Sequence, residues 1–252
     1  MSCRVVRVGN RLASLTAVAW IAIAAVAAAA PAPTADAIVA DYIAARGGLE
    51  KIRSIQTLRQ KGNAITGDGR EAVVMRELKR PGKTRFEFTV QGITAVFVAN
   101  GGQGWQVSPF EGDMEAKPLP DEAVADAVEQ ADIEGPLVDW KAKGHQVELA
   151  GREMVGGRDA YKLKVTLKSG GARYDYIDVK THYLVRTDTT RQFRGRPVQV
   201  ETTFADHRKA KGVLFPRVIE VAAVGRPQKL KVVVSSIEVN PQLSDARFEK
   251  SK

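Results

Sequence analysis

The sequence predicts a mainly β chain with some α-helix, built as one highly curved antiparallel sheet whose concave face is covered by helices. The first observation is a long series of strands between Arg158 and Val239. Within it, Tyr161–Lys168 reads YKLKVTLK, in which apolar and basic side chains alternate with the period of two that is typical of a half-buried strand. The second observation is that short connectors rich in turn residues, such as Gly170-Gly171, join consecutive strands, which we therefore expect to pair antiparallel.

The same patterns divide the whole chain into strands that are interrupted once by helices. Strands are predicted over Ile55–Ile65, Glu71–Lys79, Lys83–Val90, Ile93–Ala99, Trp105–Val107, His145–Leu149, Tyr161–Lys168, Ala172–Val179, Tyr183–Phe193, Val198–Phe204, Val213–Ala222 and Leu230–Val239. Helices are predicted over Asp36–Arg46, Leu49–Ser54, Asp121–Gln130 and Pro136–Lys143. The segments Ser108–Pro120 and Asp206–Gly212 are expected to be connectors, and the tail Asn240–Lys252 to be pinned by Leu243 and Phe248.

The N-terminus predicts export. Basic residues precede an apolar, alanine-rich run from Leu12 to Ala30, which is the pattern of a secretory signal peptide. Ala35-Asp36-Ala37 fits a cleavage site, which makes residues 1–37 the signal peptide and residues 38–252 a single domain. Cleavage at Ala27-Ala28-Ala29 and a retained membrane anchor are the alternatives. Because Cys3, the only cysteine, precedes either cleavage site, we expect a periplasmic protein without disulfides.

The chain carries no pattern typical of catalysis or of metal binding. The three histidines each lie alone beside a turn or strand end, with no second histidine or cysteine at metal-ligand spacing. Asp175 and Asp178 fall on opposite faces of their predicted strand, which argues against an acid–base pair. The glycine-rich Asn100–Gly104 precedes a strand and not the helix that a phosphate site needs, so it predicts a hairpin turn. We therefore expect a binding protein and not an enzyme, with no catalytic residues, metal or cofactor.

The formal net charge of +9 raises the question of an anionic partner. Lysines and arginines are spread along the polar faces of the strands and interleaved with glutamate and aspartate, so nucleic acid is not expected as a partner. A solvated charged face accounts for these residues, and attraction to an anionic membrane surface is the alternative.

The apolar side chains of the inner sheet face are the candidate binding site. They would line a cavity for an apolar ligand if the helices can move, and the alternative is a closed core. An acyl chain of about fifteen methylenes exposed to water costs roughly 12 kcal/mol, so a carrier needs an apolar pocket to match this. The candidates for the cavity lining are Phe86, Phe88, Val90, Val96, Val98, Trp105, Val107, Phe110, Leu163, Val165, Tyr174 and Tyr176.

Three segments in the first half of the chain share the order of motifs of a known family. Lys79–Phe86 reads KRPGKTRF, Ala95–Gly101 reads AVFVANG, and the GWQV of Gly104–Val107 is followed by Pro109-Phe110. In this order, and with the ending Val239-Asn240-Pro241, the chain resembles the LolA-like family of periplasmic outer-membrane lipoprotein carriers and lipoprotein-sorting proteins.

The resemblance implies an unclosed β-barrel, or half-barrel, with a helical lid over a hydrophobic cavity. The implied cargo is the acyl chains of lipoproteins or of another lipid, handed to an inner- or outer-membrane partner protein. Arg80 matches the arginine that holds the lid shut in the family, and a surface arginine beside a turn is the alternative. A second hypothesis on the same fold is an adaptor that senses a lipid or lipoprotein for an envelope signalling or transport system.

Overall fold

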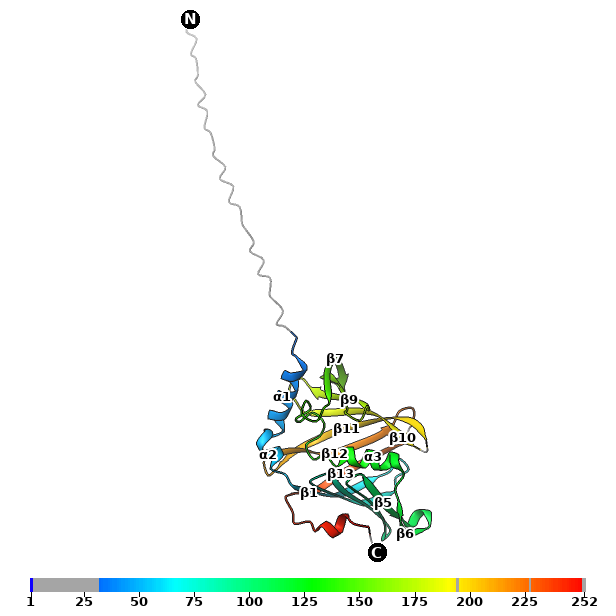
Figure 1. The fold of residues 1–252 in the computed structure, drawn as a ribbon. Helices are drawn as coiled ribbons and strands as arrows, with labels where there is room; N and C mark the ends of the chain where they lie inside the picture. The colour runs from blue at the N-terminus through cyan, green and yellow to red at the C-terminus, as the bar shows by residue number, and fades with distance from the viewer. Residues whose placement is uncertain (2–31, 194, 227, 251–252) are drawn as a thin grey trace. The chain divides into compact units, whose positions relative to one another are not determined.

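The computed structural model describes Met1 and residues 32–193, 195–226 and 228–250 (Figure 1). The predicted signal peptide lies largely outside these residues, so the structure does not test it. Within the described ranges, no helix combines the length and the apolar character needed to cross a bilayer.

The residues from Pro33 onward form one 13-stranded antiparallel sheet with helices packed on it. The helices are α1 (Ala35–Arg46), α2 (Leu49–Arg53) and α3 (Asp121–Gln130), with short 3₁₀ turns η1 (Pro109–Glu111) and η2 (Asp245–Phe248). The strands are β1 (Thr57–Ile65), β2 (Glu71–Lys79), β3 (Lys83–Val90), β4 (Ile93–Asn100), β5 (Gln103–Ser108), β6 (Asp113–Pro118), β7 (Gln146–Val155), β8 (Arg158–Thr166), β9 (Ala172–Asp178), β10 (Leu184–Phe193), β11 (Arg196–Ala210), β12 (Val213–Ala223) and β13 (Lys229–Val239).

The sheet consists of two meanders that meet along β1 and β13. The strand order is β6-β5-β4-β3-β2-β1-β13-β12-β11-β10-β9-β8-β7, and all neighbouring pairs are antiparallel. The pairing Leu58↔Val239 joins the two meanders at the middle of the sheet. In the part of the chain that the structure describes, the edge strands β6 and β7 each pair with one strand only and not with each other, so the sheet is not closed. This confirms the predicted unclosed half-barrel.

One face of the sheet, called here the inner face, is covered by α1, α3 and the segment 131–144 that follows α3. Figure 1 shows α3 lying across the strands. Ile38 and Tyr42, one helical turn apart on α1, pack with Leu163 and Val165 of β8 in the main apolar core. Thr34 caps α1 by accepting a hydrogen bond from the Ala37 amide at 3.2 Å.

The segment 131–144, called here the plug, is not the helix predicted over Pro136–Lys143. It folds as consecutive turns. Leu137 and Val138 are 2% and 0% exposed and pack into two different apolar clusters. Asp139 follows with a φ of 53°, which a right-handed helix does not allow. Burying adjacent side chains in two directions therefore overrides the local helical pattern.

The C-terminal residues 240–250 cover part of the opposite face, called here the outer face. Leu243 and Phe248 are buried against Val98 of β4, as predicted for the tail. The Arg247 guanidinium pairs with the fully buried Glu77 carboxylate at 2.6 Å. This end of the chain is thus held by both packing and charge.

Three predicted strand boundaries differ from the structure by the widest margin. The expected loop Ser108–Pro120 contains the edge strand β6, whose Pro118 is opposite Trp105, a position where the missing N–H is tolerated. The expected connector Asp206–Gly212 belongs largely to β11, because Asp206 adopts a φ of 47° without ending the strand. β7 runs to Val155, beyond the predicted end at Leu149.

Candidate functional site

α3 covers the inner face without filling the space beneath it. Three adjoining cavities of about 290, 610 and 320 Å³ lie around this helix. All three are lined by Asp126 of α3, and the first two also share Arg76 and Gln130. Together they form one hollow, called here the α3 hollow. Its cavities have the size of small-molecule binding sites, which run from roughly 300 to 1,000 Å³.

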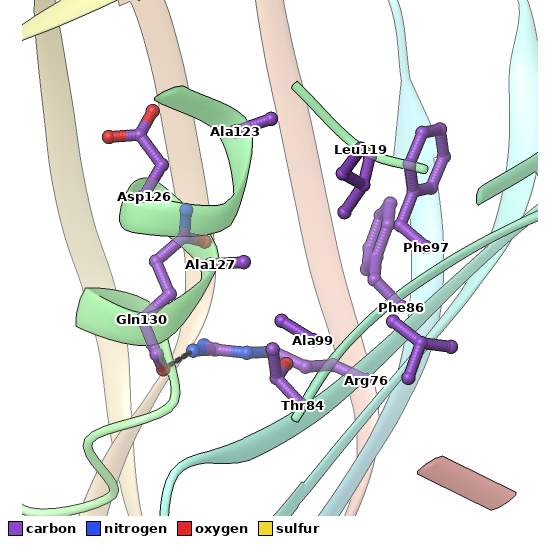
Figure 2. A pocket seen from close by; sticks show the side chains of 11 residues that line it. Arg76, Thr84, Phe86, Phe97, Ala99, Leu119, Ala123, Asp126, Ala127 and Gln130 are labelled. Carbon is purple, nitrogen blue, oxygen red and sulfur yellow. Dashed lines mark hydrogen bonds between the residues drawn. The ribbon is translucent and has the colours of Figure 1, made fainter. Parts of the chain in front are cut away.

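The part of the α3 hollow next to β3 and β4 is apolar. Figure 2 shows Phe86, Phe97 and Leu119 grouped on one side of this cavity, and α3 on the other. The helix presents Ala123 and Ala127 to the cavity. Because alanine side chains end at Cβ, they do not reach the two aromatic rings, and a space lined by apolar groups remains.

The start of α3 is positioned by a close approach to β5. Leu119 lies just before the helix, and its amide donates to the Gly104 carbonyl at 3.0 Å. A Cβ at Gly104 would lie 2.8 Å from Leu119 Cδ1 and 3.0 Å from Val124 Cγ2. Glycine at this position therefore allows the helix to pack closely on the sheet. Acidic residues in the first turn, Asp121 and Glu122, complement the positive end of the helix dipole.

The C-terminal half of α3 is tied to the sheet mainly by arginines. Arg191 of β10 pairs with Asp126 at 2.9 Å, and Arg173 of β9 pairs with Glu129 at 3.0 Å. Burial acts to lower the pKa of the Arg173 guanidinium, but its carboxylate partners outweigh this effect and raise the pKa above its usual value. Arg76 of β2 donates from Nη2 to the carbonyl oxygen of Gln130, the last residue of the helix (Figure 2).

Arginines also tie the plug to the rest of the domain. Arg80, the predicted lid-closing residue, donates from Nη2 to the buried Glu134 carboxylate at 2.7 Å and from Nε to the Ile55 carbonyl at 2.7 Å. Arg46 of α1 donates to the backbone carbonyls of Glu134 and Ile133. Arg80 thus binds the Glu134 side chain of the plug. Arg46 binds backbone carbonyls of the plug, and Arg76 binds a backbone carbonyl of α3.

Four of the predicted cavity residues lie on the inner face near α3. Phe86 lines the apolar cavity, and it shares an apolar cluster with Phe88 and Val90. Phe110 in η1 is 47% exposed, and its ring packs edge-on against Phe88 with the centroids 6.3 Å apart. These residues form a continuous apolar surface that reaches from solvent to the α3 hollow.

Four other predicted cavity residues lie on the outer face, which corrects their predicted placement. In the register of β3 and β4, Phe86 is opposite Phe97, so the side chain of the next residue, Val98, points the other way. The C-terminal residues cover this second apolar surface. Although Val98 also borders the apolar cavity, its side chain packs with Leu243 and Phe248. The outer-face residues are Val96, Val98, Trp105 and Val107.

The remaining four predicted residues divide between the two faces. Leu163 and Val165 are fully buried under α1 and the plug, and belong to the core, not to a cavity. Leu163 is opposite Asp175, so the adjacent Tyr174 and Tyr176 lie on the outer face, which again corrects their predicted place. Lys162 of β8 lies over the rings of both tyrosines, at 4.9 and 5.4 Å from their centroids.

Several residues of the α3 hollow were not predicted from the sequence. Phe97 was recognised only as part of an apolar strand, and Leu119 as part of a loop. The alanines of α3 carry no signal by themselves, because alanine is common in every helix. Arg76 interrupts the inner-facing row of β2 between Val74 and Leu78, and a charge in such an apolar row is the one signal that could have identified it.

The carboxylates of β9 have structural partners. Asp175 accepts from Arg173 and from the Thr187 hydroxyl, and Asp178 accepts from the Lys180 and Thr181 amides. Burial acts to raise the pKa of Asp178, but these hydrogen bonds outweigh it and lower the pKa below its usual value. Among the described residues no group of three or more histidine, cysteine or acidic side chains is arranged to hold a metal ion.

Comparison of the structure with solved structures gives consistent matches. A DUF1329 family protein from Desulfovibrio piger matches with a TM-score of 0.60 and 16% identity, covering 85% of this chain and 97% of that one. A putative outer membrane lipoprotein-sorting protein domain from Vibrio parahaemolyticus matches with a TM-score of 0.57 and 10% identity, covering 84% and 94%. A LolA superfamily protein from Nitrosomonas europaea matches with a TM-score of 0.55 and 13% identity, covering 87% and 99%.

This chain has a LolA-like fold. The structural matches confirm the fold that the resemblance of the sequence predicted. At the level of sequence, no model of a known protein family matches the chain, and no curated protein matches it either.

Proposed function

We propose that this protein is a periplasmic carrier that binds the acyl chains of a lipid or lipoprotein in the α3 hollow and passes them to a membrane partner. The observation that supports this most directly is the apolar cavity of about 290 Å³ between α3 and the rings of Phe86 and Phe97. The structural match to the putative outer membrane lipoprotein-sorting protein domain from Vibrio parahaemolyticus is consistent with the proposal.

α3 is the cover that would move to admit the cargo. The Arg191–Asp126 pair is partly exposed, and such pairs contribute only about 0–1 kcal/mol. Arg173 is more buried, but it also pairs with Asp175 of its own strand, a contact that does not involve α3. Acyl chains gain about 0.8 kcal/mol for each methylene removed from water, so a few methylenes offset the loss of these contacts. Weak closure suits a carrier, because the cargo must also leave.

The test is to fill the hollow from α3 and to measure binding. In Ala127→Trp the new side chain occupies the apolar cavity, and in the matched control Ala125→Trp it projects from an exposed position on the same helix. Both variants are titrated with a fluorescent apolar probe, and lipid co-purified from the periplasm is counted by native mass spectrometry. We expect at least tenfold weaker binding and loss of co-purified lipid for Ala127→Trp only. Equal binding by both variants would place the cargo elsewhere.

We propose binding without chemical turnover. The carboxylates of α3 that line the hollow, Asp126 and Glu129, pair with arginines, which supports a positioning role for them rather than proton transfer. Incubation of the purified protein with ester and amide lipid substrates should release no product. Release that survives further purification and disappears with Ala127→Trp would instead indicate a lipid hydrolase.

We infer export with cleavage upstream of Thr34. Cleavage after Ala37 would remove both the capping hydroxyl of Thr34 and the first turn of α1. Cleavage at the alternative site, Ala27-Ala28-Ala29, leaves this turn complete. The intact mass of the protein isolated from the periplasm gives the cleavage site directly. A mass that begins at Ile38, or a chain that fractionates with membranes, would contradict this inference.

A further inference from the structure

Arg76 places a positive charge between the apolar and the polar parts of the α3 hollow. It lies on β2 opposite Phe86 of β3 and lines both the cavity of about 290 Å³ and that of about 610 Å³. Figure 2 shows its side chain extending from the sheet toward α3. A group bound to Arg76 would therefore lie next to a chain bound against the aromatic rings.

Arg76 differs from Arg173 and Arg191, the other arginines that line the cavity of about 610 Å³, because no carboxylate lies within 4.0 Å of it in the described part of the chain. Its one hydrogen bond among these residues, from Nη2 to the Gln130 carbonyl, leaves most of its five N–H donors for another partner. The other charged side chains that line the larger cavity are paired, as Arg191 with Asp126, Arg173 with Glu129 and Asp175, and Asp132 with Lys143 of the plug.

The charge at Arg76 is only partly compensated by the protein. Burial and the nearby charge of Arg191 lower the pKa of Arg76 to about 10, which still leaves the guanidinium charged at neutral pH. Because Arg76 is half-buried, its charge loses part of its hydration without gaining a carboxylate partner. An anion beside the Arg76 guanidinium would supply the missing partner. Guanidinium groups bind carboxylate and phosphate oxygens through two parallel hydrogen bonds.

We propose that the α3 hollow selects anionic amphiphiles: an acyl chain lies against Phe86 and Phe97, and a phosphate or carboxylate group binds Arg76. This rests on the proposed function and narrows it from acyl chains in general to lipids with an acidic group next to the chain. The polar linings of the larger cavity, which include Thr187, Thr189 and Thr202, would surround the head group.

The test compares two ligands that share the same alkyl chain, one with an anionic phosphate group and one with a neutral hydroxyl. Dodecyl phosphate and dodecanol, below their aggregation limits, displace a fluorescent apolar probe from the protein without its signal peptide. We expect dodecyl phosphate to bind the wild type at least tenfold more tightly than dodecanol. In Arg76→Gln the two affinities should fall within about twofold of each other, with that for dodecanol unchanged. Arg76→Lys, which keeps the charge, should retain part of the preference.

Two controls separate the possible outcomes. Arg70→Gln removes an exposed arginine from the β1–β2 turn and should behave as the wild type. Inorganic phosphate alone should not displace the probe, and binding of free phosphate as tight as that of dodecyl phosphate would make Arg76 a simple anion site and overturn the proposal.

The comparison in the wild type decides the proposal even if Arg76→Gln fails to fold. Equal affinity for both ligands contradicts the selection of an anion but leaves the acyl-chain carrier intact. Failure of both ligands to displace the probe, or a probe that does not bind, contradicts the carrier itself. A preference for dodecyl phosphate that Arg76→Gln retains in the folded state would place the anion at another residue and overturn the assignment.

Discussion

The inner face of the sheet has two regions that are covered in different ways. Under α1 and the plug, Ile38, Leu163 and Val165 are at most 1% exposed and close the core. Under α3, the rings of Phe86 and Phe97 border an open cavity. The covers explain the difference, because α1 presents long apolar side chains to the sheet, whereas α3 presents alanines. The length of the side chains on the covering helix is therefore one cause of the difference between core and cavity.

The largest expected effect comes from placing a charge in each region. Val165→Asp buries an unpaired carboxylate in the closed core and should unfold the protein, with a loss of several kcal/mol. Phe86→Asp places the same group beside the α3 hollow, where water can reach it, and should leave the protein folded but unable to bind an apolar probe. Circular dichroism and probe titration measure both effects. Unfolding by both variants would mean that the hollow is a closed core in solution.

Truncation of a large side chain should also lower the free energy of unfolding more in the closed core than at the α3 hollow, but by less than the introduction of a charge does. Leu137→Ala opens a cavity in the packed core and should lower the free energy of unfolding by about 2–5 kcal/mol. Phe97→Ala enlarges a cavity that already exists, and should lower it by roughly 1 kcal/mol or less while weakening ligand binding. Urea denaturation gives both values. A loss at Phe97 equal to that at Leu137 would argue against a hollow.

Hydrogen exchange should show that the two covers differ in mobility. The amides of α3 should exchange faster than those of α1, because α3 is held by partly exposed ion pairs and by little buried apolar surface. Bound lipid should slow the exchange of α3 and leave that of α1 unchanged. Equal protection of both helices in the ligand-free protein would contradict the assignment of α3 as the movable cover.

The smallest expected effect is a pH dependence at His207, on β11 outside the α3 hollow. Burial and the charge of Arg158 lower the pKa of His207, whose Nε2 donates to the Leu184 carbonyl at 3.1 Å. The folded protein thus holds this ring neutral at a pH where the unfolded chain binds a proton, so stability declines as the pH falls below the ordinary histidine value. The melting temperature should fall less between pH 7.5 and 5.5 in His207→Gln than in the wild type. An identical decline would assign the effect to other groups.

The strands of the sheet could be predicted from the sequence, but the face on which each side chain lies could not. Alternation and turn chemistry predict most strands, because both are local properties. Which face each residue occupies depends on register, and β4 is apolar on both sides. The sequence therefore could not show that Phe97 lies inside and Val98 outside beneath the C-terminal residues. The tyrosines of β9 were misplaced for the same reason, since their pairing with β8 was unknown.

The α3 hollow could not be predicted for a different reason. A cavity is defined by side chains that are too short to fill a space, and such residues as Ala123 and Ala127 look ordinary in a sequence. The plug was wrongly predicted to be a helix. Its adjacent side chains Leu137 and Val138 pack into two different apolar clusters, and these contacts cannot be predicted from the local sequence. The motifs of the LolA-like resemblance supplied what local patterns could not, namely the existence of a covered cavity on this sheet.

The central claim is that an acyl chain binds in the α3 hollow and not in the closed core. The most direct test is to locate the bound chain by tryptophan quenching. Phe97→Trp introduces a reporter into the α3 hollow, while Trp140 beside the core and Trp105 on the outer face serve as internal references in the parent chain. Lipids brominated along the acyl chain quench only tryptophans that they touch. We expect weak quenching of the parent protein and strong quenching of the Phe97→Trp variant. Equal quenching of the two proteins, with lipid bound to both, would show that the chain does not lie in the hollow under α3.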